Sequence, residues 1–144
     1  MTDADEIRNL LGTYCELMDD ANWPGVGDMF ADAELVTETG VVFAAGAAAV
    51  RAQYEKGTRL YDGSPRTRHI TANSVIDVDG DTATARSAYL VFQAAGDVPL
   101  HPIITGRYRD KFVRIDGHWQ FAQRMFIVDH AGDLSRHLTY EVPS

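Results

Sequence analysis

The second half of the chain is a series of long, strand-like runs joined at turns. Asp79-Gly80 and Asp116-Gly117 are two-residue signals for tight β-hairpins, and residues 95–99 form a looser connection. The runs between them predict strands at residues 66–78, 81–93, 102–115 and 118–128. Consecutive strands of this length form a meander that must bury one face. The rest of the chain therefore has to supply its cover.

The first half of the chain predicts that cover. Apolar residues recur at helical spacing over residues 3–22. A capping box starts this helix, formed either by Thr2 with Asp5 or by Asp3 with Glu6. Further along, the pattern predicts a short helix that ends near Phe30, a β-hairpin over residues 34–45 and a helix over residues 46–56.

Helices segregated from an antiparallel sheet indicate an α+β fold. We expect a cone-shaped, curved, mixed or antiparallel sheet wrapped around the three helices of the N-terminal half. Such a cone has an interior pocket, which is the default site for a ligand. We assign residues 1–130 to this domain. Residues 131–144 are a polar tail, for which a lid, an oligomer contact and disorder all remain open.

Composition excludes several classes of protein. The chain has 144 residues, a net charge of −8 and a single cysteine, Cys15, which falls in a helical apolar pattern as a small buried hydrophobe would. An intramolecular disulfide and a cysteine-based zinc site are therefore excluded. The scattered basic residues argue against nucleic-acid binding. The acidic start and the lack of a long apolar run predict a cytoplasmic protein without a signal peptide or membrane span.

The candidate site starts from His69, in the strand-like run of residues 67–76. A lone histidine on a strand is more often structural than catalytic. Two carboxylates, Asp19 and Asp20, lie near the C-terminal end of the first helix, where the helix dipole disfavours negative charge. This placement suggests that one of them points inward for a reason, and composition does not decide which.

A set of residues occurs in a distinctive order along the chain. These are Tyr14 and Asp19, then Asn22-Trp23 and Phe30, then His69 and Asn73 before Asp79-Gly80-Asp81, and finally Gly106-Arg107-Tyr108 before Asp116-Gly117, Trp119 and Arg124. In this order and at these separations they resemble the SnoaL-like branch of the nuclear-transport-factor-two-like superfamily. The resemblance extends to about residue 128.

The most similar members are cofactor-free enzymes: scytalone dehydratase, bile-acid 7α-dehydratase and lindane dehydrochlorinase. They remove water or HCl from a ring. The resemblance implies that Asp19 and His69 form a catalytic dyad, with Tyr14 and Arg124 as helpers. Tyr14 could instead be an aromatic residue of the core, and Arg124 could instead be a surface residue of its strand.

The sequence departs from scytalone dehydratase at two places. Met18 stands where that enzyme has a tyrosine, and residues 87–93 contain no second histidine. The scytalone reaction itself is therefore not expected, and the pattern is more similar to the bile-acid enzyme.

These residue types suit an elimination. Histidine can remove an acidic C–H proton near neutral pH, and a buried carboxylate can hold the imidazole in one tautomer. Tyr14 could donate a hydrogen bond to an enolate or a departing hydroxyl, and Arg124 could do the same or balance the charge of Asp19. We expect a lyase, a dehydratase acting on a hydrophobic cyclic molecule such as a steroid, polyketide or aromatic-pathway intermediate. The alternatives are an isomerase or polyketide cyclase with the same dyad, and a non-catalytic binding protein or dioxygenase accessory subunit.

The remaining expectations concern the surroundings of the dyad. Candidates for the apolar pocket wall are Leu17, Met18, Tyr54, Tyr89, Val91, Ile104, Tyr108 and Phe126. We expect four other histidines at the surface, the first and third of them able to approach the pocket mouth: His101, His118, His130 and His137. We expect neither a cofactor nor a metal, because no histidine pair has ligand spacing. As partners we expect the substrate and further copies of the chain, as a trimer or a dimer.

Overall fold

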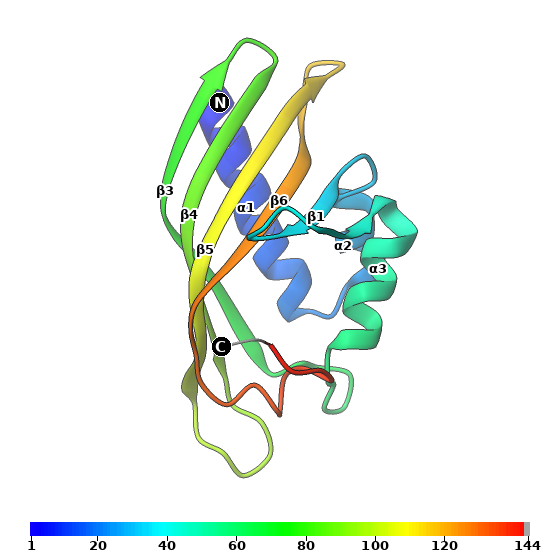
Figure 1. Ribbon diagram of the computed structural model, residues 1–144, viewed down its shortest axis with the longest axis vertical. Helices are drawn as coiled ribbons and strands as arrows, with labels where there is room; N and C mark the ends of the chain where they lie inside the picture. The colour runs from blue at the N-terminus through cyan, green and yellow to red at the C-terminus, as the bar shows by residue number, and fades with distance from the viewer. Residues whose placement is uncertain (143–144) are drawn as a thin grey trace.

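The computed structural model describes residues 1–142. Three helices and six strands follow one another along the chain (Figure 1). In order they are α1 (Asp3–Asp19), α2 (Trp23–Met29), β1 (Glu34–Thr37), β2 (Val42–Ala45), α3 (Gly46–Gly57), β3 (Thr67–Asp79), β4 (Thr82–Gln93), β5 (His101–Ile115) and β6 (His118–Ala131). The predicted α+β class is confirmed.

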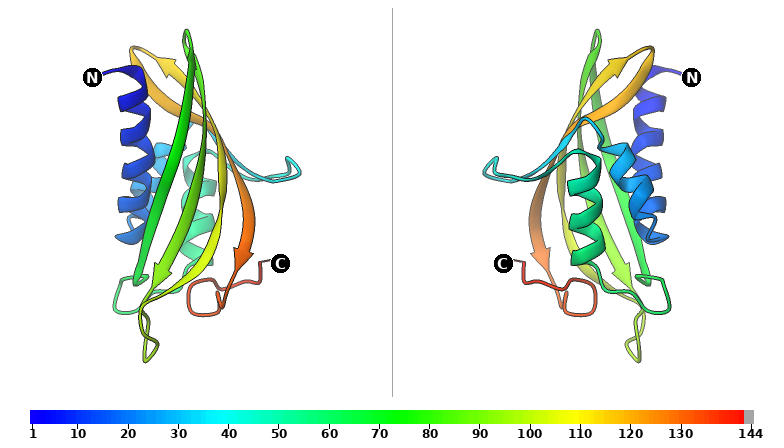
Figure 2. Two further views of the ribbon diagram at one scale, coloured as in Figure 1. Left: turned by 90° about the vertical axis from the view of Figure 1, so that its left-hand side faces the viewer. Right: turned by 90° about the vertical axis from the view of Figure 1, so that its right-hand side faces the viewer.

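All strands belong to one sheet with the order β2-β1-β6-β5-β4-β3. The four long strands form the predicted antiparallel meander. The short hairpin β1–β2 extends it through a parallel pairing between β1 and β6. The sheet is therefore mixed and open, and β6 continues to Ala131, beyond the end predicted at residue 128. In profile the long strands bend around the helices, and α1 lies along the concave face (Figure 2).

The first helix begins as predicted and ends early. Thr2 caps it, and the side chain of Asp5 completes the capping box. The prediction that the helix continues to residue 22 is wrong. Ala21 adopts a positive φ of 54°, and the side chain of Asn22 accepts a hydrogen bond from the Gly25 backbone as the cap of α2. A residue that caps the next helix cannot also continue the first one.

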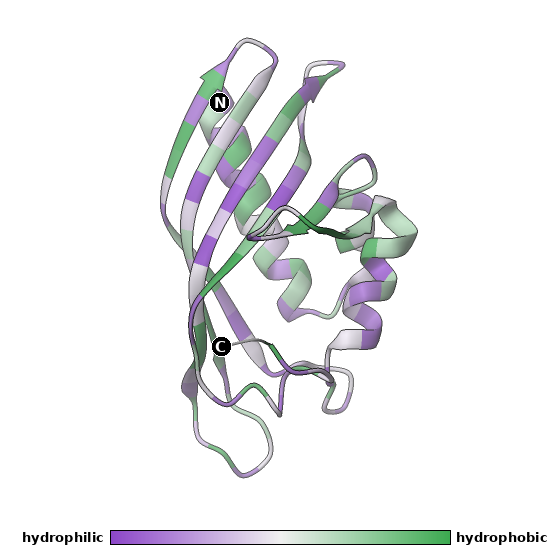
Figure 3. Ribbon diagram, in the orientation of Figure 1, coloured by the Kyte–Doolittle hydropathy of each residue, from purple (hydrophilic) through white to green (hydrophobic). Residues whose placement is uncertain are grey.

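The apolar face of α1 packs into the cone. Ile7, Leu11, Tyr14 and Met18 are buried on that face. Polar and apolar residues alternate along the long strands, as expected for a sheet with one face against the core (Figure 3).

Irregularities in the ladders bend the long strands. The pairing of β3 with β4 shifts between Ala72 and Val75, where Asn73 has a φ of 57°. The register also shifts in the pairing of β5 with β4 and in the pairing of β5 with β6. Such bulges increase the local bend and twist of a sheet, which here gives the concave face its depth.

The chain beyond β6 folds back across the open end of the cone. Leu138 forms a bridge with Thr58, and the backbone carbonyl of Arg136 accepts hydrogen bonds from the side chains of Tyr61 and Gln93. This part of the predicted tail is therefore packed against the domain, while residues 143–144 lie outside the described part of the chain. Within residues 1–142, no helix is both long and apolar enough to cross a membrane.

Candidate active site

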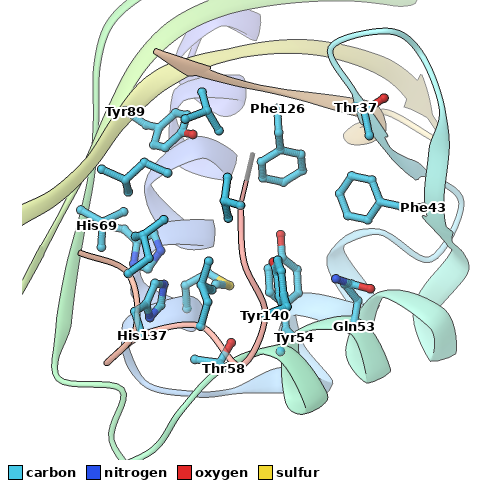
Figure 4. Close-up of a pocket in the computed structure, with 18 of the residues that line it drawn as sticks. Thr37, Phe43, Gln53, Tyr54, Thr58, His69, Tyr89, Phe126, His137 and Tyr140 are labelled. Atoms are coloured by element: carbon cyan, nitrogen blue, oxygen red, sulfur yellow. The ribbon is translucent and has the colours of Figure 1, made fainter. Parts of the chain in front are cut away.

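A cavity of about 750 Å³ lies between the concave face of the sheet, α1, α3 and the returning tail. Figure 4 shows its lining side chains, which include aromatic rings on several walls and two histidines at one end. Seven of the predicted wall residues line it: Met18, Tyr54, Tyr89, Val91, Ile104, Tyr108 and Phe126.

The prediction that Leu17 lines the pocket does not agree with this cavity. Tyr14 and Met18 are four residues apart and share the inner face of α1, where both contact the cavity. Leu17 falls to one side of that face and packs against Gly25 at the start of α2.

Asp19 and His69 meet at the cavity wall. The Oδ1 atom of Asp19 lies 2.6 Å from Nδ1 of His69. The same carboxylate accepts the backbone N–H of His69, at 3.0 Å to each oxygen, and the hydroxyl of Thr67 at 2.9 Å. Both side chains are largely buried, with exposed fractions of 14% for Asp19 and 7% for His69. Asp20 is exposed and caps the end of α1, so the carboxylate at His69 is that of Asp19.

This bonding pattern orients the imidazole. A carboxylate at Nδ1 places the proton of a neutral ring on that nitrogen. Nε2 is then the nitrogen with a free lone pair, and His69 lines the cavity. The arrangement can therefore accept a proton from a molecule in the cavity, while Asp19 stabilises the charged ring that results.

Tyr14 lies in the cavity wall and is paired with a second tyrosine. Its hydroxyl is 2.8 Å from the hydroxyl of Tyr54. Burial raises the pKa of both phenols, so both remain protonated, and one of the two O–H groups stays free to donate outside the pair. The sequence assigned Tyr54 only to the apolar wall, and its hydroxyl adds a polar group there.

Arg124 lies beneath the cavity rather than in its wall. It is fully buried and pairs with Asp110, at 2.8 Å and 3.0 Å. Its guanidinium stacks over the rings of Tyr14 and Tyr108, at 4.3 Å and 3.7 Å from their centroids. Although burial opposes the charged form, the Asp110 carboxylate raises the pKa of Arg124. The ion-pair partner of Arg124 is therefore Asp110 and not Asp19.

His137 is the site residue that sequence reasoning missed. We expected it at the surface, but it is only 6% exposed and lines the cavity. Its ring centroid lies 6.0 Å from that of His69 (Figure 4). Burial, followed by the neighbouring His69, lowers its pKa to about 4. The other three histidines do not line the cavity, and the side chain of His118 is 81% exposed.

The described chain offers no evident metal centre. Among residues 1–142, no three side chains of His, Cys, Asp or Glu come together as ligands.

Residues 1–125 match the SnoaL-like domain. The chain belongs to the SnoaL-like family. A comparison with curated proteins finds no match. The matched region of this SnoaL-like chain contains Asp19, His69, Tyr14 and Arg124, whereas His137 lies beyond it.

Solved structures share the fold of this SnoaL-like protein. A form of Rv3472 from Mycobacterium tuberculosis, a protein of unknown function, is 27% identical with a TM-score of 0.75, over 89% of this chain and 72% of that chain. An NTF2-like protein from Novosphingobium aromaticivorans is 24% identical with a TM-score of 0.73, over 88% of this chain and 81% of that chain. A candidate scytalone dehydratase from the same organism is 22% identical with a TM-score of 0.73, over 99% of this chain and 90% of that chain. The NTF2-like cone fold is thereby established.

Proposed function

We propose that the protein is a cofactor-independent lyase that removes water from a hydrophobic cyclic molecule. The observation that carries this proposal is the contact between Asp19 and His69 at the wall of a mostly apolar cavity. A buried carboxylate fixed to one ring nitrogen serves a base on the other side of the ring. A cavity that only bound a ligand would have no need of this pair.

The charge of the cavity limits the substrate. Its described lining contains neither lysine nor arginine. Two exposed carboxylates, Glu38 and Glu141, are part of the lining. The nearest buried cation, Arg124, is already neutralised by Asp110. An anionic group would lose its hydration here without gaining a counter-charge, so the substrate is an uncharged ring compound.

The proposed reaction uses one proton acceptor. Nε2 of His69 removes the proton from the carbon next to a carbonyl, and the electron pair moves into an enolate. The enolate then re-forms the carbonyl as the C–O bond to the β-hydroxyl breaks. The proton on His69 passes to that leaving hydroxyl, so water is released and the base is regenerated. One hydroxyl of the Tyr14–Tyr54 pair donates to the other, which leaves one O–H to donate to the enolate oxygen.

The family supports this assignment. One solved structure with the same fold carries the description of a candidate scytalone dehydratase, which is a water-eliminating enzyme by name. Because Met18 and residues 87–93 differ from the pattern of scytalone dehydratase, we expect a substrate other than scytalone.

The test is a turnover screen with a panel of uncharged cyclic β-hydroxy ketones. We expect the loss of one water, measured by mass spectrometry and by the absorbance of the conjugated product. His69→Ala should lower this rate by about a hundredfold or more, since it removes the base. His118→Ala, which changes an exposed histidine, should not. Equal rates in the wild type and a folded His69→Ala variant would refute the base.

An isomerase or cyclase is the second candidate. It is favoured by the Tyr14–Tyr54 hydroxyl pair, which could hold an enolate without any leaving group. The same dyad would then return the proton to another carbon, or the enolate would attack within the molecule. Product mass separates the two assignments, because isomerisation leaves it unchanged and dehydration lowers it by one water.

A further inference from the structure

His137 is a buried polar side chain that the proposed mechanism does not yet use. It comes from the returning tail and not from a strand or a helix. It lines the same end of the cavity as His69, and the two rings are inclined to each other by 66° (Figure 4).

The tail holds this ring in a fixed position. The backbone N–H of His137 donates to the carbonyl of Leu134 at 3.0 Å, and its own carbonyl accepts the N–H of Arg59 at 2.8 Å. Next to it, the carbonyl of Arg136 accepts from Tyr61 at 2.6 Å and from Gln93 at 3.0 Å. A segment tied to the domain at this many points presents its side chain as part of a formed wall.

The ring has unused hydrogen-bonding capacity. Its Nδ1 is buried and has no partner among the described residues, so Nε2 is the ring nitrogen that a molecule in the cavity can reach. Since burial lowers the pKa of His137 to about 4, the ring is neutral near pH 7. A neutral imidazole donates from one nitrogen and accepts at the other.

The spacing of the two histidines suits an oxygen atom between them. At 6.0 Å between centroids, the rings are too far apart for a direct hydrogen bond. An oxygen placed between them can lie within about 3 Å of a nitrogen on each ring.

We propose that His137 is a substrate-binding residue that holds an oxygen of the substrate next to the carbon deprotonated by His69. The site thereby selects ring compounds that carry a carbonyl or hydroxyl at this point over hydrocarbons of the same shape. This inference rests on the proposed function for the role of His69, but the binding of oxygen by His137 can be measured without turnover.

The test compares two flat probes of similar size, 2-naphthol and 2-methylnaphthalene, with dissociation constants measured by fluorescence. The wild type should prefer 2-naphthol. His137→Phe should raise the dissociation constant of 2-naphthol about tenfold and leave that of 2-methylnaphthalene nearly unchanged. His137→Gln, which keeps a polar amide, should retain part of the preference and serves if the phenylalanine variant does not fold. His118→Phe is the control, because that side chain is 81% exposed and outside the cavity lining.

A purely structural role for His137 gives a different result. The variants would then weaken the binding of both probes equally, or of neither, and either outcome overturns the proposal.

The same measurements distinguish a failure of this proposal from a failure of the proposed function. If no panel compound turns over while His137→Phe still removes the preference for 2-naphthol, the oxygen site stands without the elimination. If turnover depends on His69 but the preference survives in His137→Phe, the elimination stands and this inference is wrong.

Discussion

At the scale of single residues, the Asp19 carboxylate is surrounded by donors. It accepts from the backbone N–H and the ring of His69 and from the hydroxyl of Thr67. This carboxylate therefore fixes the strand, the ring and the tautomer together. An amide in its place would turn one acceptor into a donor that faces other donors.

We expect Asp19→Asn to lower turnover by about a hundredfold or more, because the imidazole loses both its orientation and its stabilising charge. Steady-state kinetics on the compound found in the panel measure this. Asp20→Asn is the matched control, since the neighbouring carboxylate is exposed at the helix end. If Asp20→Asn lowered turnover more than Asp19→Asn, the functional carboxylate would be that of Asp20.

The sequence allowed only part of the site to be predicted at this scale. The contact between Asp19 and His69 was predicted through the order of residues by which the chain resembles its family. Asp110 was missed, although it lies midway between two aromatic residues of one strand, Tyr108 and Phe112, both of which are buried. The alternation of a strand puts the residue between them on that same face. His137 carried no comparable signal, because the path of an irregular tail depends on distant contacts.

At the scale of elements, a buried ion pair joins β5 to β6. Asp110 and Arg124 are cross-strand partners in the ladder, and both side chains have an exposed fraction of 0%. The aromatic rings around the guanidinium contribute cation–π contacts, while the bidentate carboxylate balances its charge.

We expect Asp110→Leu to lower the free energy of unfolding by about 3–5 kcal/mol, because it leaves a buried charge without a partner. The double variant Asp110→Leu/Arg124→Met removes both charges and should recover a large part of that loss. Urea unfolding of both proteins measures the difference. A double variant that is less stable than the single one would show that the guanidinium itself, through its ring contacts, dominates.

The elements also show what local pattern can and cannot determine. Hairpin signals and alternation predicted the meander, because those interactions lie close together along the chain. The parallel pairing of β1 with β6 joins residues 34–37 to residues 123–126. Nothing in either segment specifies a partner so far away, so this pairing follows from packing of the whole domain.

At the scale of the whole molecule, the returning tail couples closure of the cavity to stability. It brings His137 against the end of the cone where Asp19 and His69 lie. In the folded protein the pKa of His137 is about 4, below its ordinary value of 6.5. The unfolded chain therefore binds a proton more readily than the native state between these values.

Stability should consequently fall with acid in a way that depends on this one residue. The contribution of neutral His137 is fully present above about pH 6.5 and is lost as the pH falls toward about 4, with a total of about 3 kcal/mol. Between pH 7 and pH 5 we expect the wild type to lose about 2 kcal/mol more than His137→Gln, in urea unfolding at each pH. The acidic groups titrate in both proteins and cancel in this comparison. If the two proteins lose stability in parallel, His137 is already accessible to protons in the native state. The tail would then not close the cavity in solution.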